Sequence, residues 1–246
     1  MQPRSTSKSE RVLSLAEVRK MIMAAGRPEY ARVAQRFFKT GRGQYGEGDI
    51  FIGIRVPDLR QLSKRCTHLT LPEITVLLAS KIHEERLMAL YLLIHWYEKG
   101  GVKERQAIID LYLASTALIN NWDLVDTSAD KLLGRHLEAR SKTVLERLAH
   151  SSQLWERRIA IVSTFWFIRR GEMAPTIRIA TLLLKDQQDL IHKAVGWMLR
   201  EVGKRSLVAE EAFLDEHAAM MPRTMLRYAI ERFPEQRRRW YLTQGA

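Results

Sequence analysis

The chain has 246 residues and carries 40 Lys and Arg against 28 Asp and Glu, a net charge of +12. A surplus of this size points to a polyanionic partner such as nucleic acid, although charge alone supports only non-specific binding. No apolar run is long enough to cross a bilayer, residues 1–12 lack the apolar core of a secretory signal, and the single cysteine, Cys66, excludes an intramolecular disulfide. These features predict a protein of the reducing cytoplasm with no membrane partner.

Helical periodicity governs the chain after a polar leader. Residues 1–10 are expected to be disordered, and a single domain is expected over 11–246. Apolar residues then recur every three to four positions, and Gly and Pro stand where helices stop or start. No stretch alternates as a strand would, so the chain is predicted to be all-α. The predicted helices cover residues 14–25, 28–40, 57–66, 72–80, 84–98, 102–116, 122–138, 142–150, 154–170, 174–184, 187–203, 207–219 and 222–232.

Three segments share one design, an apolar helix that ends in a basic, Gly-containing stop. They read LMALYLLIHWYEKG, RRIAIVSTFWFIRRG and HKAVGWMLREVGKR. Such units recur at intervals of roughly 35–40 residues, and a recurrence of this kind favours repeats of the HEAT or armadillo type. The recurrence predicts a HEAT-like helical-repeat solenoid whose concave, basic face would bind the partner. A compact helical bundle is the alternative.

Two possible ligand-binding signals are weak. The loop GRGQYGEGD at 41–49 is rich in glycine, but no Gly-Lys-Ser/Thr follows it and no strand precedes it, so a flexible connection between helices is expected. The seven histidines show no paired ligand spacing. No metal or other cofactor is predicted.

A carboxylate and a guanidinium each interrupt an apolar helix face. Asp126 follows Trp122 by one turn and lies on a stripe that continues through Val125, Ala129, Leu132, Leu133 and Leu137. Arg158 lies between Leu154 and Val162 on a second apolar stripe. Because an unpaired buried charge is costly, Asp126 and Arg158 are expected to pair with each other. The alternative to a functional role is an ion pair that only joins neighbouring repeats.

The predicted helix at 187–203 carries a second polar face. Its apolar stripe includes Ile191 and Val195, while positions spaced by four, three and four residues on the opposite side are Lys193, Trp197, Arg200 and Lys204. The cations could neutralise phosphates and the indole could contact a sugar or base. The alternative is a second packing layer that covers Trp197.

These segments resemble the AlkD-type DNA alkylation repair proteins, which are HEAT-like repeat alkylpurine DNA glycosylases. The matching blocks are WDLVD at 122–126, LWERRIAIV at 154–162 and HKAVGWMLRE at 192–201, with weaker matches at 51–62 and 221–231. The resemblance covers nearly the whole chain after the leader. It implies a monomeric, cofactor-free hydrolase that acts in base excision repair. Its substrate would be double-stranded DNA with positively charged N3- or N7-alkylated purines, in a bacterial-type cytoplasm where the protein associates with the nucleoid.

The resemblance also assigns residues by motif. The family's catalytic aspartate matches Asp126, its active-site arginine matches Arg158, and its two tryptophans beside the sugar match Trp122 and Trp197. Candidate DNA contacts are Lys193, Arg200, Lys204, Arg157, Arg223 and Arg227. One position departs from the pattern, because Val33 stands where the family carries an aromatic residue in its first repeat. This departure bears on lesion range and rate.

The chemistry fits such a site. Cleavage of the glycosidic bond builds positive charge on the deoxyribose, which an oriented carboxylate and electron-rich indole faces stabilise. Asp126 could also position the attacking water, and a leaving group that is already charged needs no general acid. The main alternative is a non-catalytic HEAT-like protein that binds DNA or structured RNA. A protein-interaction scaffold is less favoured, because its groove would not need so many cations.

Overall fold

A computed structural model describes residues 12–244, and the regular elements within this range are all helices. The described residues contain one isolated β-bridge, between Ile50 and Ile82, and no strand, so the all-α prediction is confirmed. None of their helices has the length and hydropathy needed to cross a bilayer. The leader predicted at 1–10 lies outside the described residues. The chain divides into two compact units, Met1–His95 and Trp96–Ala246, which are taken in turn, and the single domain predicted over 11–246 stays a prediction.

The first unit is built from short helices with clear start signals in the sequence. Ser14 and Glu17 form a capping box at the start of its first helix, and Thr70 and Glu73 form another before its fourth. Proline occupies the first turn of the second, third and fourth helices, where its missing N–H costs nothing. The helices are α1 (Leu15–Ala25), α2 (Pro28–Phe37), α3 (Val56–Lys64) and α4 (Leu71–Leu78), followed by α5 (His83–Lys99), which runs through the boundary of the two units.

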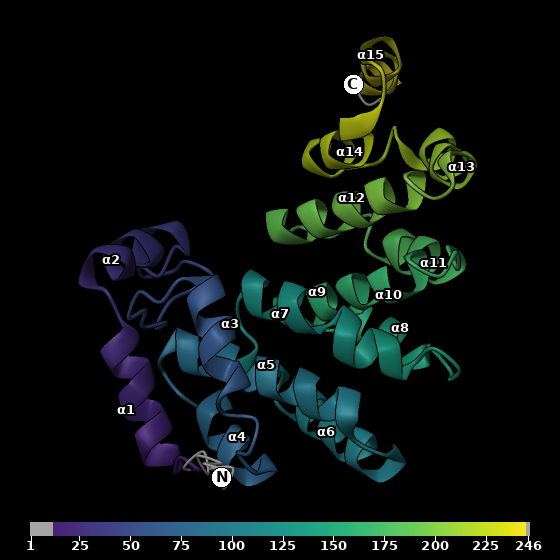
Figure 1. Cartoon of the computed structure of the whole chain (residues 1–246). Helices are drawn as coiled ribbons and strands as arrows, with labels where there is room; N and C mark the ends of the chain where they lie inside the picture. The colour runs from purple at the N-terminus through teal and green to yellow at the C-terminus, as the bar shows by residue number, and fades with distance from the viewer. Residues whose placement is uncertain (1–11, 245–246) are drawn as a thin grey trace, which may run out of the picture. The chain divides into compact units, whose positions relative to one another are not determined.

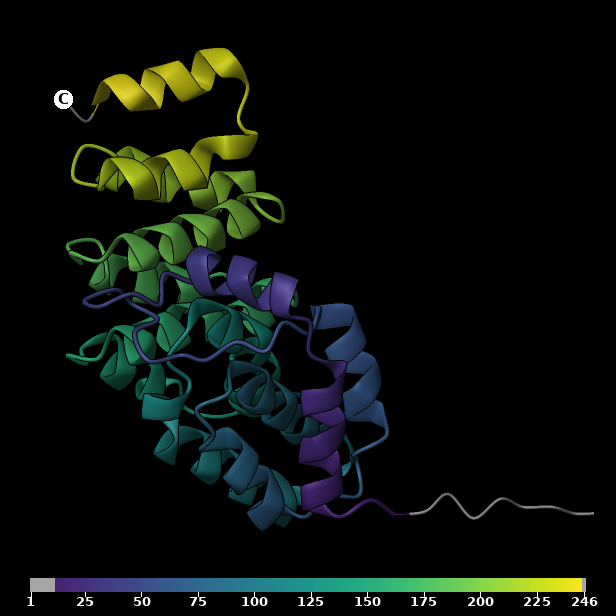
Figure 2. The same cartoon turned by 90° about the vertical axis from the view of Figure 1, so that its left-hand side faces the viewer.

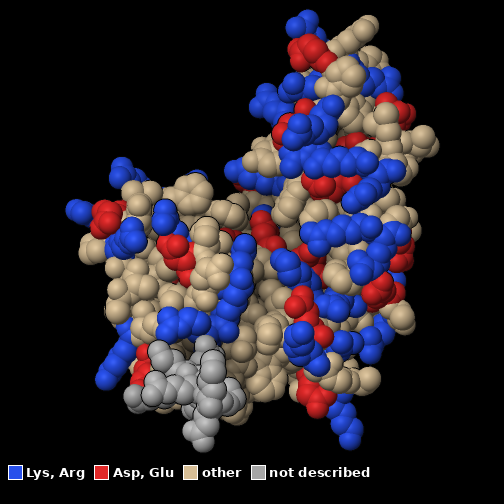
Figure 3. All heavy atoms as spheres, viewed as in Figure 1, with Lys and Arg blue, Asp and Glu red and all other residues tan. Residues whose placement is uncertain are grey.

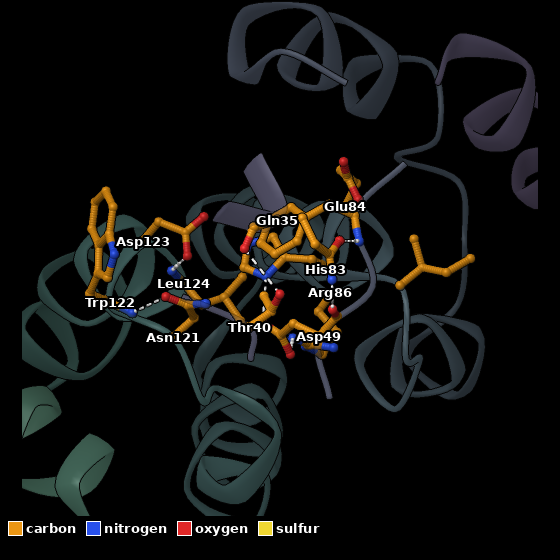
Figure 4. A network of polar contacts seen from close by, with 12 residues as sticks. Gln35, Thr40, Asp49, His83, Glu84, Arg86, Asn121, Trp122, Asp123 and Leu124 are labelled. Atoms are coloured by element: carbon orange, nitrogen blue, oxygen red, sulfur yellow. Dashed lines mark hydrogen bonds and ion pairs between the residues drawn. The ribbon is translucent and has the colours of Figure 1, made fainter. Parts of the chain in front are cut away.

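The Gly-rich loop at 41–49 is tied down at its final residue. The buried Asp49 carboxylate accepts a hydrogen bond from Arg86 Nη2 at 2.5 Å and pairs with His83 Nδ1 at 3.0 Å. Its backbone carbonyl accepts a hydrogen bond from Gln35 Nε2 at 2.8 Å, as Figure 4 shows. The loop therefore joins α2 to the segment before α3 with one end held against the start of α5.

In the second unit, helices stack in chain order, as Figures 1 and 2 show. One row is formed by α7 (Trp122–Ser128), α9 (Leu154–Ser163), α12 (Asp189–Gly203) and α14 (Arg223–Ala229), each packed on the next. A second row contains α8 (Thr143–Ala149) and α11 (Ala174–Leu182), which contact each other and also α9. The remaining helices are α6 (Val102–Ala114), η1 (Thr116–Leu118), α10 (Phe165–Ile168), α13 (Leu207–His217), η3 (Ile230–Arg232) and α15 (Glu235–Gln244).

Three ion pairs between neighbouring layers share the same separation along the chain. Asp126 with Arg158, Glu138 with Arg170, and Glu146 with Arg178 are each 32 residues apart. Equal separations mean that equivalent positions of successive repeats face each other, as stacked repeats require. The interval is close to the one expected from the recurring apolar helices.

Two predicted long helices are broken in the structure. The helix predicted at 122–138 consists of α7 and a π-helical turn, η2 (Asp130–Gly134), in which the Gly134 N–H bonds the Ala129 carbonyl at 2.9 Å. The helix predicted at 154–170 is interrupted at Ser163 and Thr164, whose hydroxyls bond the carbonyls of the preceding turn. The two breaks meet, because a β-carbon at Gly134 would lie 2.3 Å from the Ser163 carbonyl oxygen.

The end of the chain also differs from expectation. The sequence around Arg237 favours a solvated tail, but residues Glu235–Gln244 form α15, which packs on the unit. Tyr241 is fully buried, contacts the Phe233 ring with centroids 5.7 Å apart and donates a hydrogen bond to Asp215 Oδ1 at 2.8 Å. Arg237 stacks over Trp240 at 4.9 Å. The predicted helices end at residue 232 and miss α15, because the apolar positions of this segment find partners only in the tertiary structure.

Gly134 offers a test of this close approach. Gly134→Ala would place a β-carbon 2.3 Å from a backbone oxygen, and is expected to lower the free energy of unfolding by about 2 kcal/mol or more in urea titrations. In Gly101→Ala, the new β-carbon would meet only the flexible Glu104 carboxylate, and because Gly101 is the N-cap of α6, a loss of about 1 kcal/mol or less is expected. Equal losses in the two variants would show that Gly134 is not a tight contact.

Candidate active site

The first turn of α7 is organised by its capping residues. The buried Asn121 is the N-cap, and its side-chain oxygen accepts a hydrogen bond from the Trp122 N–H at 2.8 Å. Asp123 accepts the Leu124 N–H at 2.9 Å, so its carboxylate lies at the positive end of the helix dipole (Figure 4). Trp122 is thereby fixed as the first helical residue, half-buried, one turn before Asp126.

Asp126 and Arg158 form the ion pair expected from their helix faces. Arg158 Nε donates to Asp126 Oδ1 at 3.0 Å, and Arg158 Nη2 donates to Asp126 Oδ2 at 2.8 Å, a two-point contact that fixes the carboxylate plane. The third guanidinium nitrogen, Nη1, donates to the Leu190 carbonyl at the start of α12. Arg158 therefore connects α7, α9 and α12.

The carboxylate of this pair is partly accessible while the guanidinium is enclosed. The Asp126 side chain is 19% exposed and the Arg158 side chain 6%. Burial raises the pKa of the Asp126 carboxyl above its ordinary value, while the charge and hydrogen bonds of Arg158 oppose that rise. The result is a carboxylate that Arg158 orients and that stays partly exposed.

Trp197 lies on α12, about two turns beyond the Leu190 carbonyl that Arg158 binds. Its half-buried indole contacts the Phe165 ring, with centroids 5.8 Å apart, and its Nε1–H donates to Glu201 Oε1 at 3.2 Å. The structure thus brings Asp126 and Arg158 into direct contact and places Trp122 on the same helix as Asp126. It places Trp197 on a helix that packs against α9.

The cations predicted on the polar face of α12 each have an acidic partner. Lys193 pairs with Asp189 at 2.7 Å, and Lys204 pairs with Glu201 at 2.6 Å. Arg200 pairs with Glu231, which comes from the next repeat. Asp189 and Glu201 could be predicted from the sequence as partners, because they lie four and three residues from their lysines on the same helix. Glu231 could not be predicted in this way. In Figure 3, Lys and Arg lie across the visible face of the second unit with Asp and Glu between them.

The remaining candidate cations differ in their surroundings. Arg157 is bound to both carboxylate oxygens of Asp186 and to the carbonyls of Ser151 and Ser152, so its guanidinium is engaged within the fold. Arg223 is exposed and donates to the Leu242 carbonyl at 2.7 Å. Arg227 is exposed and has no carboxylate partner among residues 12–244. Arg227 is therefore available to an anion, and Arg157 holds the turn before α9.

The departure noted at Val33 is visible in the first unit. Val33 lies on α2, a helix without a fully buried residue, and is 60% exposed. Tyr30 and Phe37 are exposed one turn before and after it. An aromatic side chain is thus present next to Val33 on either side. No group of three or more His, Cys, Asp or Glu in the described part of the chain is placed to hold a metal ion.

The second unit is a stack of helices packed in chain order, which is the architecture of a helical-repeat protein. The ion pair of Asp126 and Arg158 connects three of these helices. The family model described as DNA alkylation repair enzyme matches residues 18–233, and the chain belongs to this family. A predicted DNA alkylation repair enzyme from Enterococcus faecalis shares the fold, with a TM-score of 0.67, 18% identity, and coverage of 85% of this chain and 97% of that one. The protein smu.31 from Streptococcus mutans also shares the fold, with a TM-score of 0.54 and 16% identity. The match covers 90% of this chain and 98% of that one. These matches confirm the helical-repeat prediction; no curated protein matches the sequence.

Arg157 and Arg227 form a matched pair for testing which arginines hold the fold. Arg157→Ala would leave the buried Asp186 carboxylate without its partner, and is expected to lower the free energy of unfolding by about 3 kcal/mol. Arg227→Ala removes an exposed side chain and is expected to change it by less than about 0.5 kcal/mol. Urea titrations of both variants provide the measurement. A stable Arg157→Ala protein would remove the structural role assigned here.

Proposed function

We propose that the protein is a monofunctional glycosylase that excises positively charged N3- or N7-alkylated purines from double-stranded DNA. The observation that carries the proposal is the Asp126 carboxylate, which Arg158 holds at two points while part of it stays exposed. Membership of the DNA alkylation repair enzyme family supports DNA as the substrate. A cationic lesion, as the family resemblance implies, suits a site that offers the Asp126 carboxylate and indole faces.

The reaction needs no cofactor and balances with water. Water adds to C1′ of the deoxyribose while the C1′–N bond breaks, and the bonding electrons neutralise the cationic purine as it leaves. Positive charge peaks on the sugar, where an oriented carboxylate stabilises it without reorganisation. Asp126 also accepts a hydrogen bond from the attacking water, whose proton then passes to solvent. Trp122 and Trp197 offer ring faces that attract the cationic sugar.

Arg158 serves as a positioning residue in this proposal. Two of its nitrogens hold the Asp126 carboxylate, and the third is anchored to the Leu190 carbonyl of α12, so the carboxylate cannot rotate without breaking both of its bonds to Arg158. Its charge also favours the ionised form of Asp126 against the effect of burial. The catalytic group is therefore preorganised by the packing of the repeats.

DNA binding is assigned to the cations of α12 and α14. Lys193, Arg200 and Lys204 would exchange their carboxylate partners for phosphates, and Arg223 and Arg227 would extend the contact. Because the first three are already paired, binding costs the loss of those pairs and depends on salt. Arg157 is left out of the proposed interface, since its donors are engaged by Asp186 and two carbonyls.

The second candidate function is non-catalytic binding of DNA or structured RNA. It is favoured by one observation, that Asp126 and Arg158 already satisfy each other and connect adjacent repeats. In that case the pair would be purely structural.

Asp126→Asn separates the two functions. The substitution removes the charge and keeps the size, so release of methylated purines from alkylated duplex DNA is expected to fall by at least about a hundredfold, the scale of losing a main electrostatic group. Single-turnover release, measured by chromatography of the free base, provides the comparison. Equal release by both proteins would end the catalytic assignment. Salt-sensitive duplex binding without release by the unmodified protein would favour the second function.

The pH dependence of release tests the role of Arg158. The active form has an ionised Asp126, so the rate should fall as the pH drops through the pKa of this carboxyl, which burial places above its ordinary value. Arg158→Met removes the charge that opposes this rise, and the acidic limb of the profile should move to higher pH. Single-turnover rates between about pH 4 and 8 give the limb. A limb that stays in place or moves to lower pH would show that Arg158 does not tune Asp126.

A further inference from the structure

The polar edge of the Trp197 indole is held by Glu201, the last residue of the matching block at 192–201, to which the sequence analysis gave no role. Glu201 follows Trp197 by one turn on α12, and its Oε1 accepts the indole Nε1–H at 3.2 Å. The same oxygen pairs with Lys204 Nζ at 2.6 Å. The Glu201 side chain is only 14% exposed, so these two contacts fix it beside the indole.

The ring of Trp197 is constrained on another side by aromatic packing. Phe165 lies 5.8 Å from it, centroid to centroid, with an angle of 55° between the planes. Arg169 in turn stacks over Phe165, with its guanidinium carbon 4.0 Å from the ring centroid. Trp197 therefore has a hydrogen bond at its nitrogen edge and a ring at its side, which together restrain the orientation of the indole.

We infer that Glu201 is a positioning residue for the reaction, which orients Trp197 and makes its indole face more electron-rich. The inference rests on the proposed function, in which Trp197 faces the cationic sugar. A hydrogen bond from an indole N–H to a charged acceptor is charge-assisted, and it shifts electron density towards the ring. The attraction of a ring face for a cation grows with that density.

Glu201 also places a negative charge near the indole, which Lys204 offsets until that lysine exchanges its carboxylate partner for a phosphate. Glycosidic cleavage of a cationic purine transfers positive charge to the sugar, so a fixed carboxylate nearby favours the transition state without touching the substrate. This role differs from that of Asp126, which lies on α7 and would meet the sugar directly. The proposed site thus combines one contacting carboxylate with a second that acts through a ring.

A double-mutant cycle tests whether Glu201 acts through Trp197. Glu201→Gln keeps the length and an acceptor oxygen but removes the charge, and is expected to lower the single-turnover rate of purine release about tenfold at saturating enzyme. Affinity for undamaged duplex should stay equal or rise, because a negative charge has been removed. In a Trp197→Phe background the same change should cause no further loss.

Glu235→Gln is the matched control, because Glu235 is also a helical carboxylate that pairs with arginines three and four residues away, on α15. It is expected to leave the release rate unchanged. A Glu201→Gln rate equal to that of the unmodified protein, or a full additional loss in the Trp197→Phe background, overturns the inference and leaves the proposed function intact. No release by the unmodified protein overturns the proposed function and the inference with it.

A second readout reports the contact itself. In a nitrogen-15 spectrum, the indole N–H resonance of Trp197 is identified by its loss in Trp197→Phe. Glu201→Gln should move that resonance upfield in the proton dimension, because the charged acceptor is gone, while the resonances of the other indoles stay in place. A general shift of all of them, with a lower melting temperature, would show that Glu201 supports the fold and not Trp197, which also overturns the inference.

Discussion

The contact between Asp126 and Arg158 is the interaction on which the second unit and its candidate site both depend. It crosses from α7 to α9, and the same guanidinium reaches the first turn of α12. Removing either partner would leave a charge stranded among apolar side chains, at a cost of about 3–5 kcal/mol. The groups that would act on substrate are therefore groups the packed repeats already require. The orientation of the Asp126 carboxylate therefore follows from the same contact that joins the repeats.

Pairing also decides how the surplus of positive charge is presented. The chain carries a net charge of +12, yet the cations on the polar face of α12 are neutralised by Asp189, Glu201 and Glu231. Such pairs hold long side chains in place and reduce non-specific attraction to polyanions. The side chains of Lys193 and Lys204 are 39% and 44% exposed, so their partners can be exchanged for phosphates, whereas the Arg200 side chain is 18% exposed. Arg157 shows the opposite outcome, since its partners enclose it and assign it to the fold. The adjacent residues Arg157 and Arg158 therefore have different partners. Arg157 binds Asp186 and the carbonyls of the turn before α9, whereas Arg158 binds Asp126 on α7.

Helical spacing was sufficient to predict the all-α class, most helix starts and the partner of Asp126. It worked because a charge on an apolar stripe stands out in sequence and leaves few ways to be satisfied. It failed at the π-helical turn after α7, at the break after Ser163 and at α15. These features arise where segments distant in sequence press on each other. Gly134 sits against the Ser163 carbonyl, and Tyr241 is buried through contacts with Phe233 and Asp215.

By itself, the sequence determined the helical repeat, the positions of the caps and the residues that could not be solvated, because these depend on local periodicity and on the cost of burying a charge. Tertiary structure alone decided which cations stay available, which carboxylates restrain them and how Trp197 is held. Those outcomes depend on contacts between residues distant in sequence, such as Arg200 with Glu231, which are 31 positions apart. They also depend on which of several nearby carboxylates a basic side chain pairs with. The sequence therefore identified Asp126 and Trp197 as candidates, and the packing of α7, α9 and α12 set how each of them is oriented.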